Sequence, residues 1–200
     1  MFLDTIFTVS LTLLGGLFWG SLTGVLTNTI IHIIEYHNIY SDWYGSFYGH
    51  LFAICQIAVA LVTYLFMRIF PGDLCLTVKQ NPKTPVPQTF FVSRRLSIVT
   101  ERVVVLALLA FALALIISIL GGLISTLIGF MEIAAQGEGS FNPASIEIWL
   151  VMFGNEMPVI WREILTRIPI NIPDRLISSF AGYGIALAFV KSPFAKILKE

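Results

Sequence analysis

The feature that most limits what this chain can fold into is an uninterrupted apolar segment near its middle. Val103–Phe130 runs for about 28 residues without an Asp, Glu, Lys or Arg. An α-helix rises 1.5 Å per residue, so roughly 20 such residues already cross the hydrocarbon core of a bilayer. The segment therefore predicts a membrane-spanning helix.

The composition of the whole chain supports the same interpretation. Only 12% of the 200 residues are charged, 56% are hydrophobic, and the mean hydropathy is +0.85. Soluble domains typically carry about 25% charged residues. So little charge cannot cover a water-soluble globule, and lipid must solvate much of the outside. We therefore expect one integral membrane domain over residues 1–200, an all-α polytopic transmembrane helix bundle in the cell membrane.

Two further apolar tracts lie before the central segment. Leu3–Ile34 is longer than one span and has Gly15-Gly16 in its middle. It predicts either one kinked helix or, as we favour, two segments, Phe2–Leu14 and Leu17–Ile34. Tyr44–Phe70 is the next predicted span. The stretch 71–100 is rich in proline and charge, so we expect it to be a polar loop between spans.

The C-terminal third is more polar. Ala144–Ile168 mixes aromatic and charged residues, which predicts an amphipathic interfacial helix or a helix packed inside the protein. Pro169 and Pro173 are expected to break the chain before a final short span, Leu176–Val190. The chain thus has four firm membrane segments, and up to six in all.

Orientation follows from the basic residues. The positive-inside rule places the Lys79–Arg102 loop and the Lys-rich C-terminus in the cytoplasm. Four crossings satisfy both placements, whereas six crossings put the basic loop outside.

Small residues recur every fourth position in several segments. Such spacing places them on one helix face, where they let helices or a partner protein approach closely. The alternative is that Gly is simply common in membrane helices. The predicted helix-packing or partner positions are Gly16, Gly20, Gly24, Gly121, Ser125 and Gly129.

Polar residues gather near the segment ends. Polar groups in a membrane are costly and usually mark a cavity or an internal pair. Together they predict a ligand pocket near one membrane face. For each residue a structural role is the alternative: Asp4 and Asp174 as helix caps, Arg162 and Glu163 as an ion pair. The candidate ligand-binding residues are Asp4, Thr5, Asn28, His50, Glu156, Arg162, Asn171 and Asp174.

Several function classes receive no support. The chain lacks HExxH, GxSxG, P-loop and Rossmann glycine patterns, so we expect no enzyme activity and no cofactor. Its two cysteines form neither a disulfide framework nor a metal motif. Zero net charge argues against nucleic acid as a partner. Transport against a gradient would need a coupled ion or, more simply, a partner that binds ATP.

Two stretches resemble a known family. Leu3-Asp4-Thr5-Ile6-Phe7-Thr8, followed by Gly15-Gly16, Gly20, Gly24 and Asn28, is similar to an LDTIGT…GPxxG…G…N pattern. That pattern belongs to substrate-binding S components of energy-coupling factor (ECF) importers and related bacterial membrane-sensor modules. The stretch Ile168–Leu176, leading into Gly182-Tyr183-Gly184, resembles their last helix.

The resemblance implies a six-helix bundle that binds a vitamin-like or other micronutrient ligand. It also implies a separate transmembrane coupling subunit with two ATPases as the energy source. The alternative is a non-transporting membrane sensor or scaffold subunit of a larger complex. A weaker alternative is a membrane enzyme acting on lipid, with Glu156, Arg162 and Glu163 as its polar centre.

Overall fold

The computed structural model describes residues 3–38, 49–70, 74, 91–136 and 157–192, which are almost all helical and include no strand. The expected all-α class is confirmed. The elements are α1 (Leu3–Gly15), α2 (Leu17–Asn38), the short 3-10 helix η1 (Gly49–Phe52), α4 (Ala53–Ile69), α6 (Phe91–Gln136) and α8 (Val159–Lys191). Two helical stretches are long and apolar enough to cross a membrane, His50–Ile69 and Thr100–Met131.

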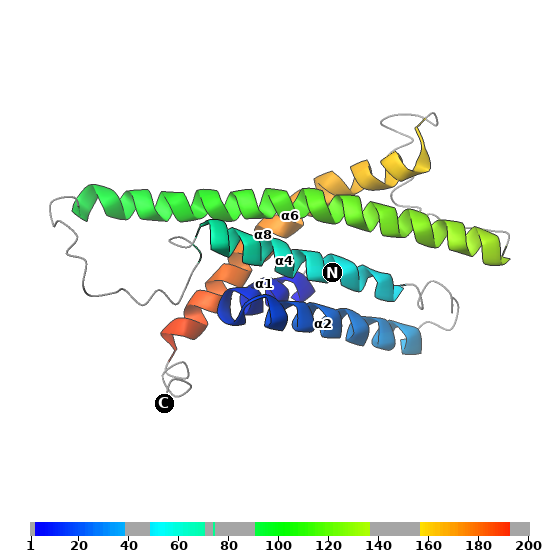
Figure 1. Cartoon of the computed structure of the whole chain (residues 1–200), viewed down its shortest axis with the longest axis horizontal. Helices are drawn as coiled ribbons and strands as arrows, with labels where there is room; N and C mark the ends of the chain where they lie inside the picture. The colour runs from blue at the N-terminus through cyan, green and yellow to red at the C-terminus, as the bar shows by residue number, and fades with distance from the viewer. Residues whose placement is uncertain (1–2, 39–48, 71–73, 75–90, 137–156, 193–200) are drawn as a thin grey trace.

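The helices alternate in direction along the chain. In Figure 1, α2, α4 and α6 run side by side with alternating direction, and α8 crosses behind them obliquely. The short helix α1 packs against α2, α4 and α8. The bundle therefore has two ends. One holds Gly16, Ile69, Phe91 and Lys191, and is called the basic end; the other holds Asn38, Gly49, Gln136 and Val159, and is called the acidic end.

The N-terminal tract folds as a helical hairpin. Gly16 separates α1 from α2 with φ +85°, a left-handed conformation that glycine adopts without steric cost. Its N–H donates to Thr12 O at 2.9 Å, which closes the end of α1. The predicted division into two segments at Gly15-Gly16 is thus confirmed. Gly16 belongs to the turn, however, and no atom lies within 4 Å of a Cβ placed there, so it does not share the packing face of Gly20 and Gly24.

The central helix is longer than its apolar segment. α6 has 46 residues and begins at Phe91, so the prediction that 71–100 is loop is wrong for its last ten residues. No proline or glycine follows Pro87 before the apolar segment, and nothing stops the helix from extending toward the N-terminus. The Tyr44–Phe70 span is represented by η1 and α4, while residues 39–48 lie outside the described part.

The expected break at the two prolines is also wrong. Pro169 and Pro173 lie inside α8, which continues unbroken for 33 residues. Both side chains are exposed and point away from the neighbouring helices. Each proline removes one backbone hydrogen bond, and packing of α8 against α6 and α1 keeps the helix intact. Of the predicted helix Ala144–Ile168, residues 159–168 form the start of α8 and residues 144–156 lie outside the described part.

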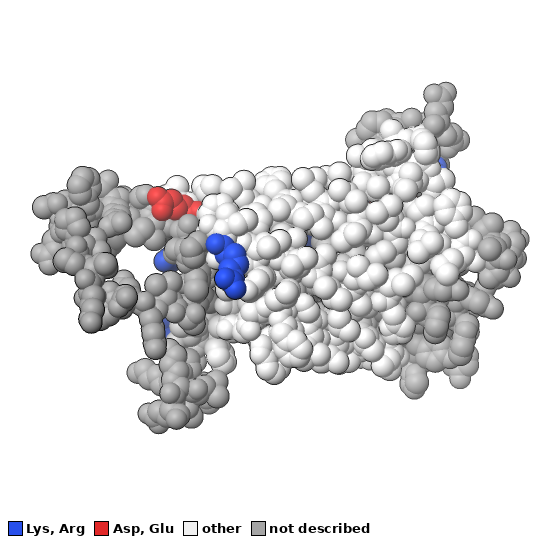
Figure 2. All heavy atoms as spheres, viewed as in Figure 1, with Lys and Arg blue, Asp and Glu red and all other residues white. Residues whose placement is uncertain are grey.

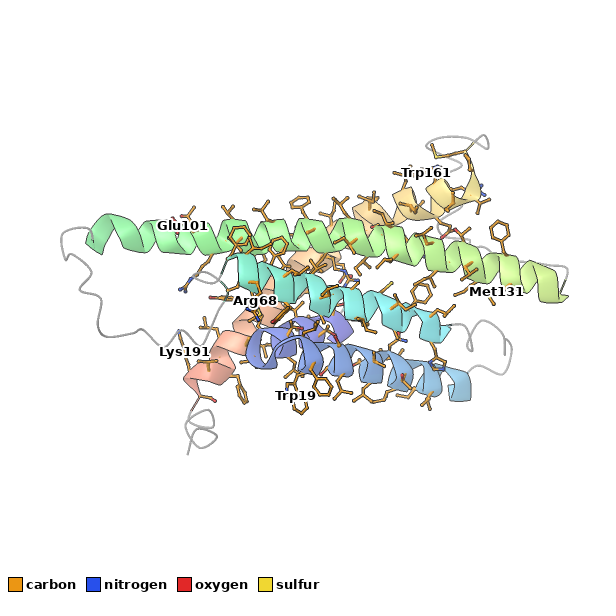
Figure 3. All side chains as sticks on the ribbon, in the orientation of Figure 1. Trp19, Arg68, Glu101, Met131, Trp161 and Lys191 are labelled. Atoms are coloured by element: carbon orange, nitrogen blue, oxygen red, sulfur yellow. The ribbon has the colours of Figure 1, made fainter. Side chains whose placement is uncertain are left out.

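The interior is apolar at its centre, and so is the outer surface. Val9, Val59, Leu109 and Leu113 are fully buried or nearly so and form part of one core. Large apolar side chains also cover the outside of α6, from Val104 and Leu108 to Phe130. Figure 2 shows a broad, almost uncharged middle, with charged atoms gathered mainly at one end of this face. Figure 3 places Arg68, Glu101 and Lys191 at the basic end, and Met131 and Trp161 toward the acidic end.

A buried polar stripe as candidate functional site

One face of α8 carries a row of polar side chains that points into the bundle. Apart from one adjacent pair, the residues recur at intervals of three or four, which places them on one side of a helix. We name this row the α8 polar stripe; it consists of Glu163, Arg167, Asn171, Asp174, Arg175 and Ser178. Glu163 is 1% exposed, Asp174 6% and Arg175 8%, which is unusual burial for charged side chains.

The part of the stripe nearest the acidic end is an ion pair within α8, and its arginine also contacts α6. Arg167 Nη2 lies 3.5 Å from Glu163 Oε2, one helical turn away. The same nitrogen donates to Ser125 Oγ of α6 at 2.6 Å. The guanidinium also lies 5.9 Å from the ring centroid of Phe52, within the range of a cation–π contact. Arg167 is therefore oriented by α6 and by the start of α4, as well as by its own helix.

The middle of the stripe is a neutral contact. Asn171 Nδ2 donates to Ser118 Oγ of α6 at 2.9 Å. The Ser118 hydroxyl accepts this bond from α8 and itself donates to Ala114 O, one turn earlier in α6, at 2.6 Å. This pair links the two charged parts of the stripe without adding charge.

The part of the stripe nearer the basic end joins α8 to α1. Arg175 Nη1 donates to Thr5 Oγ1 in a short hydrogen bond, and its Nη2 lies 3.1 Å from Asp174 Oδ2. Ser178 Oγ donates to Asp174 Oδ1 at 3.4 Å. Asp174 is thus the partner of a buried arginine in mid-helix, and the interpretation of Asp174 as a helix cap is wrong. One helical turn further, Ser10 of α1 donates to the carbonyl oxygen of Gly182 at 3.0 Å.

Glycines set the short distances between the helices that carry these groups. A Cβ on Gly122 of α6 would lie 2.9 Å from the backbone of Ile164, and one on Gly182 of α8 would lie 3.1 Å from Ile6 O. The first contact is closer than real Cβ atoms come, and the second would require the neighbouring backbone to shift by a few tenths of an ångström. Gly121 lies under the Arg167 guanidinium, where a Cβ would be 3.4 Å from Nη1. The α6–α8 and α1–α8 contacts therefore depend on backbone approach at these positions.

The remaining predicted packing residues lie mostly on α2. A Cβ on Gly20 would clash with Thr12 of α1, and one on Gly24 would clash with Gln56 of α4. Beside Gly24, Thr8 Oγ1 donates to Gln56 Oε1 at 3.3 Å. Gly129 is buried in α6. The small residues thus join α2 to α1 and α4, and α6 to α8, within this chain.

The charges of the stripe balance, although not every polar atom has a partner. Glu163 and Asp174 offset Arg167 and Arg175, which matters because an uncompensated buried charge costs several kcal/mol. Among the described residues, three buried atoms of the stripe lack a hydrogen-bond partner: Glu163 Oε2, Arg167 Nε and Arg175 Nε. The ion pair at 3.5 Å is longer than the usual 2.7–2.9 Å of a charged hydrogen bond. The stripe therefore retains one acceptor and two donors for another molecule.

The structure brings three of the eight predicted ligand-binding residues together, namely Thr5, Asn171 and Asp174. Arg162 is half-buried at the start of α8, and His50 is exposed in η1. Asn28 is buried on α2, and among the described residues its Nδ2 has no hydrogen-bond partner. The side chain of Asp4 and the whole of Glu156 lie outside the described residues.

The predicted set of ligand-binding residues does not include Arg167, Arg175 and Ser118, which the structure places in this site. Their signal is the spacing Glu163, Arg167, Asn171, Arg175, four residues apart each time. That periodicity is visible only if the helix is carried through Pro169 and Pro173.

No metal centre is found among the described residues, since no three His, Cys, Asp or Glu side chains gather there. Comparison with known proteins found no matching family model, no matching curated protein and no matching solved structure.

Proposed function

We propose that this chain is a multi-pass membrane subunit that binds a small polar ligand at the α8 polar stripe, as the substrate-binding part of an importer. The observation that carries the proposal is the burial of two acidic side chains and Arg175, with Arg167 partly buried beside Glu163, inside a bundle with an apolar exterior. Ionisable groups within membrane helices are rare and commonly mark substrate or ion sites.

The helix arrangement supports four crossings. The helices α2, α4, α6 and α8 have 22, 17, 46 and 33 residues and alternate in direction (Figure 1). α1 has 13 residues, about 20 Å at 1.5 Å per residue, which is short of the hydrocarbon thickness of about 30 Å. We therefore assign α1 to a hairpin that packs inside the bundle without crossing it.

The distribution of charge supports an orientation. Helix ends and connecting segments at the basic end carry nine of the twelve Lys and Arg residues: Arg68, Lys79, Lys83, Arg94, Arg95, Arg102, Lys191, Lys196 and Lys199. Positively charged segments remain on the cytoplasmic side of a membrane. In the proposed orientation the basic end faces the cytoplasm, and the acidic end faces outward.

The importer role rests on the resemblance to ECF S components together with one contact. Thr5 belongs to the first similar stretch and Arg175 to the second, and the two residues are hydrogen-bonded at the stripe. The two stretches that carry the resemblance thus meet at the proposed ligand site. Without a nucleotide-binding motif in the chain, energy for uptake would come from a transmembrane coupling subunit and its ATPase pair.

A thermal-shift screen of the purified protein in detergent tests ligand binding. The panel consists of water-soluble vitamins, nucleobases and metal chelates. We expect one compound to raise the Tm of the wild-type protein, and Asn171→Leu, which removes the amide at the centre of the stripe, to reduce that shift. A panel that leaves Tm unchanged would contradict the proposal. Co-purification of an ATPase pair with the tagged chain tests the energy source separately.

A sensor or scaffold subunit is the second candidate. Its supporting observation is that the four charges of the stripe already balance one another within α8. Such a protein would form a stable complex in detergent, and deletion of its gene would leave solute uptake unchanged. An uptake defect on deletion would rule this candidate out.

A further inference from the structure

We propose that the ligand carries a monovalent organic ammonium group, and that this group pairs with Glu163 at the acidic end of the α8 polar stripe. The inference rests on the proposed function and names the chemical class of the ligand. Two independent observations lead to it: the incomplete pairing of Glu163 and the charge at the end of the bundle nearest to it.

Glu163 is the acceptor that the fold leaves available. Its side chain is 1% exposed, and Oε2 accepts no hydrogen bond from the described residues. The residue lies four positions after Val159, so it is about 6 Å along the helix axis from the start of α8. The carboxylate therefore lies about one helical turn inside the end of α8 that faces the acidic end.

Arg167 contacts Glu163 but does not depend on it. Its Nη2 donates to Ser125 at 2.6 Å while remaining 3.5 Å from Glu163 Oε2. Glu163 Oε2 thus has an ion pair with Arg167 but no hydrogen bond, and an incoming N–H⁺ group can donate to it while Arg167 stays bound to Ser125. The Phe52 ring, which already faces the Arg167 guanidinium, adds an aromatic surface suited to a cation.

The charge of the acidic end favours a cation over an anion. Helix ends and connecting segments there carry six acidic residues and one basic residue, Arg162; the acidic ones are Glu35, Asp42, Glu132, Glu138, Glu147 and Glu156. A concentration of one sign of charge raises the local concentration of counter-ions and their rate of binding. It also offsets the positive charge that a cationic ligand adds to the neutral stripe.

The alternatives fit less well. An anion beside Glu163 would place two like charges together in a low-dielectric interior, which is strongly unfavourable. A divalent metal ion usually needs several oxygen, nitrogen or sulfur ligands, and in the described part of the chain no three suitable side chains gather. An ammonium group can be held by a single carboxylate, which Glu163 supplies.

The test compares three probes of equal size and different charge on the full-length protein in detergent: n-butylamine, butyrate and butyramide at pH 7. Sodium and magnesium chloride are added in separate samples. We expect only the amine to stabilise the protein, by about 3–5 °C at ten times its Kd. Glu163→Gln should weaken amine binding about 30-fold or more, whereas Glu101→Gln, an exposed glutamate at the basic end, should leave it unchanged.

Every outcome bears on the inference. Stabilisation by butyrate or butyramide alone would overturn the ammonium assignment and leave the proposed ligand-binding function standing. Equal stabilisation by sodium or magnesium, lost in Glu163→Gln, would replace the ammonium with a metal cation. If neither these probes nor the micronutrient panel shifts Tm, the ammonium assignment and the proposed function both fail. Should Glu163→Gln not fold, Glu163→Asp keeps the charge and is expected to retain the preference for the amine.

Discussion

Arg167 of α8 donates a hydrogen bond to Ser125 of α6 at 2.6 Å, and this contact ties the polar stripe of α8 to the uncharged central segment of α6. The central segment of α6 contains no charged residue, yet Ser125 and Ser118 offer hydroxyl groups at the two levels where α8 presents Arg167 and Asn171. Arg167 and Asn171 of the stripe therefore each meet a hydroxyl group of α6. The contribution of each hydrogen bond to the stability of the protein can be measured separately.

Ser125→Ala should lower the stability of the folded protein by about 1–3 kcal/mol, because a partly buried hydrogen bond to a charged group is lost. Unfolding by SDS in mixed micelles measures the change. Ser192→Ala, an exposed position that bonds only its own helix end, is the matched control and should change stability little. Equal behaviour of the two variants would show that Arg167 does not rely on Ser125.

Arg175→Gln should be more damaging, at about 3–5 kcal/mol, because it leaves Asp174 as an uncompensated buried charge. The double variant Asp174→Asn with Arg175→Gln should recover part of that loss, since both charges are then absent. Thermal unfolding in detergent measures both. Arg68→Gln, an exposed arginine that contacts Tyr64, is the control and should stay within about 0.5 kcal/mol of wild type. No recovery in the double variant would argue against direct pairing.

Gly122→Ala should weaken the α6–α8 contact, since a Cβ there would lie 2.6 Å from the Ile164 side chain and 2.9 Å from its backbone. Overpacking of this kind costs about 1–3 kcal/mol. Gly184→Ala is a matched control in α8, where no atom lies within 4 Å of the added Cβ. That control should be neutral or stabilising, because alanine favours helix more than glycine does. The same Tm for both variants would contradict the close approach at Gly122.

Gly16→Ala should destabilise the α1–α2 hairpin by about 1–2 kcal/mol, the cost of a left-handed backbone for a residue with a Cβ. Gly16→Asn should lose less, because asparagine tolerates this conformation better. Thermal unfolding of the two variants side by side separates backbone strain from side-chain crowding, since the space around Gly16 is open. If both variants match wild type, the turn is not left-handed at this residue.

The helices that depend on local signals could be predicted from the sequence. The pair Gly15-Gly16 marked the division of the first tract, and the uncharged segment marked the body of α6. The N-terminal extension of α6 could not be predicted from hydropathy, because Phe91–Arg102 is polar. The continuity of α8 could not be predicted either. A proline costs about 3 kcal/mol in an isolated helix, and only contacts with α6 and α1, distant in sequence, outweigh that cost.

The residues of the candidate site could also be predicted only in part. Thr5, Asn171 and Asp174 stood out as polar residues near apolar segments, and all three lie at the stripe. The predicted ligand-binding set leaves out Arg167 and Arg175, because a break at Pro169 and Pro173 removes the four-residue spacing that relates them. Which polar residue meets which helix depends on the crossing at Gly122 and Ile164, a tertiary contact that local sequence does not specify.

The most direct test of the account is the side of the membrane on which each end of the bundle lies. In a Cys55→Ser background, the native Cys75 reports on the segment between α4 and α6. In a variant that also carries Cys75→Ser, Glu138→Cys reports on the segment between α6 and α8. With intact cells and a membrane-impermeant maleimide, the account predicts labelling of the cysteine at 138 and labelling of Cys75 only after permeabilisation. Labelling of both from outside, or release of the protein from membranes by alkaline carbonate, would contradict it.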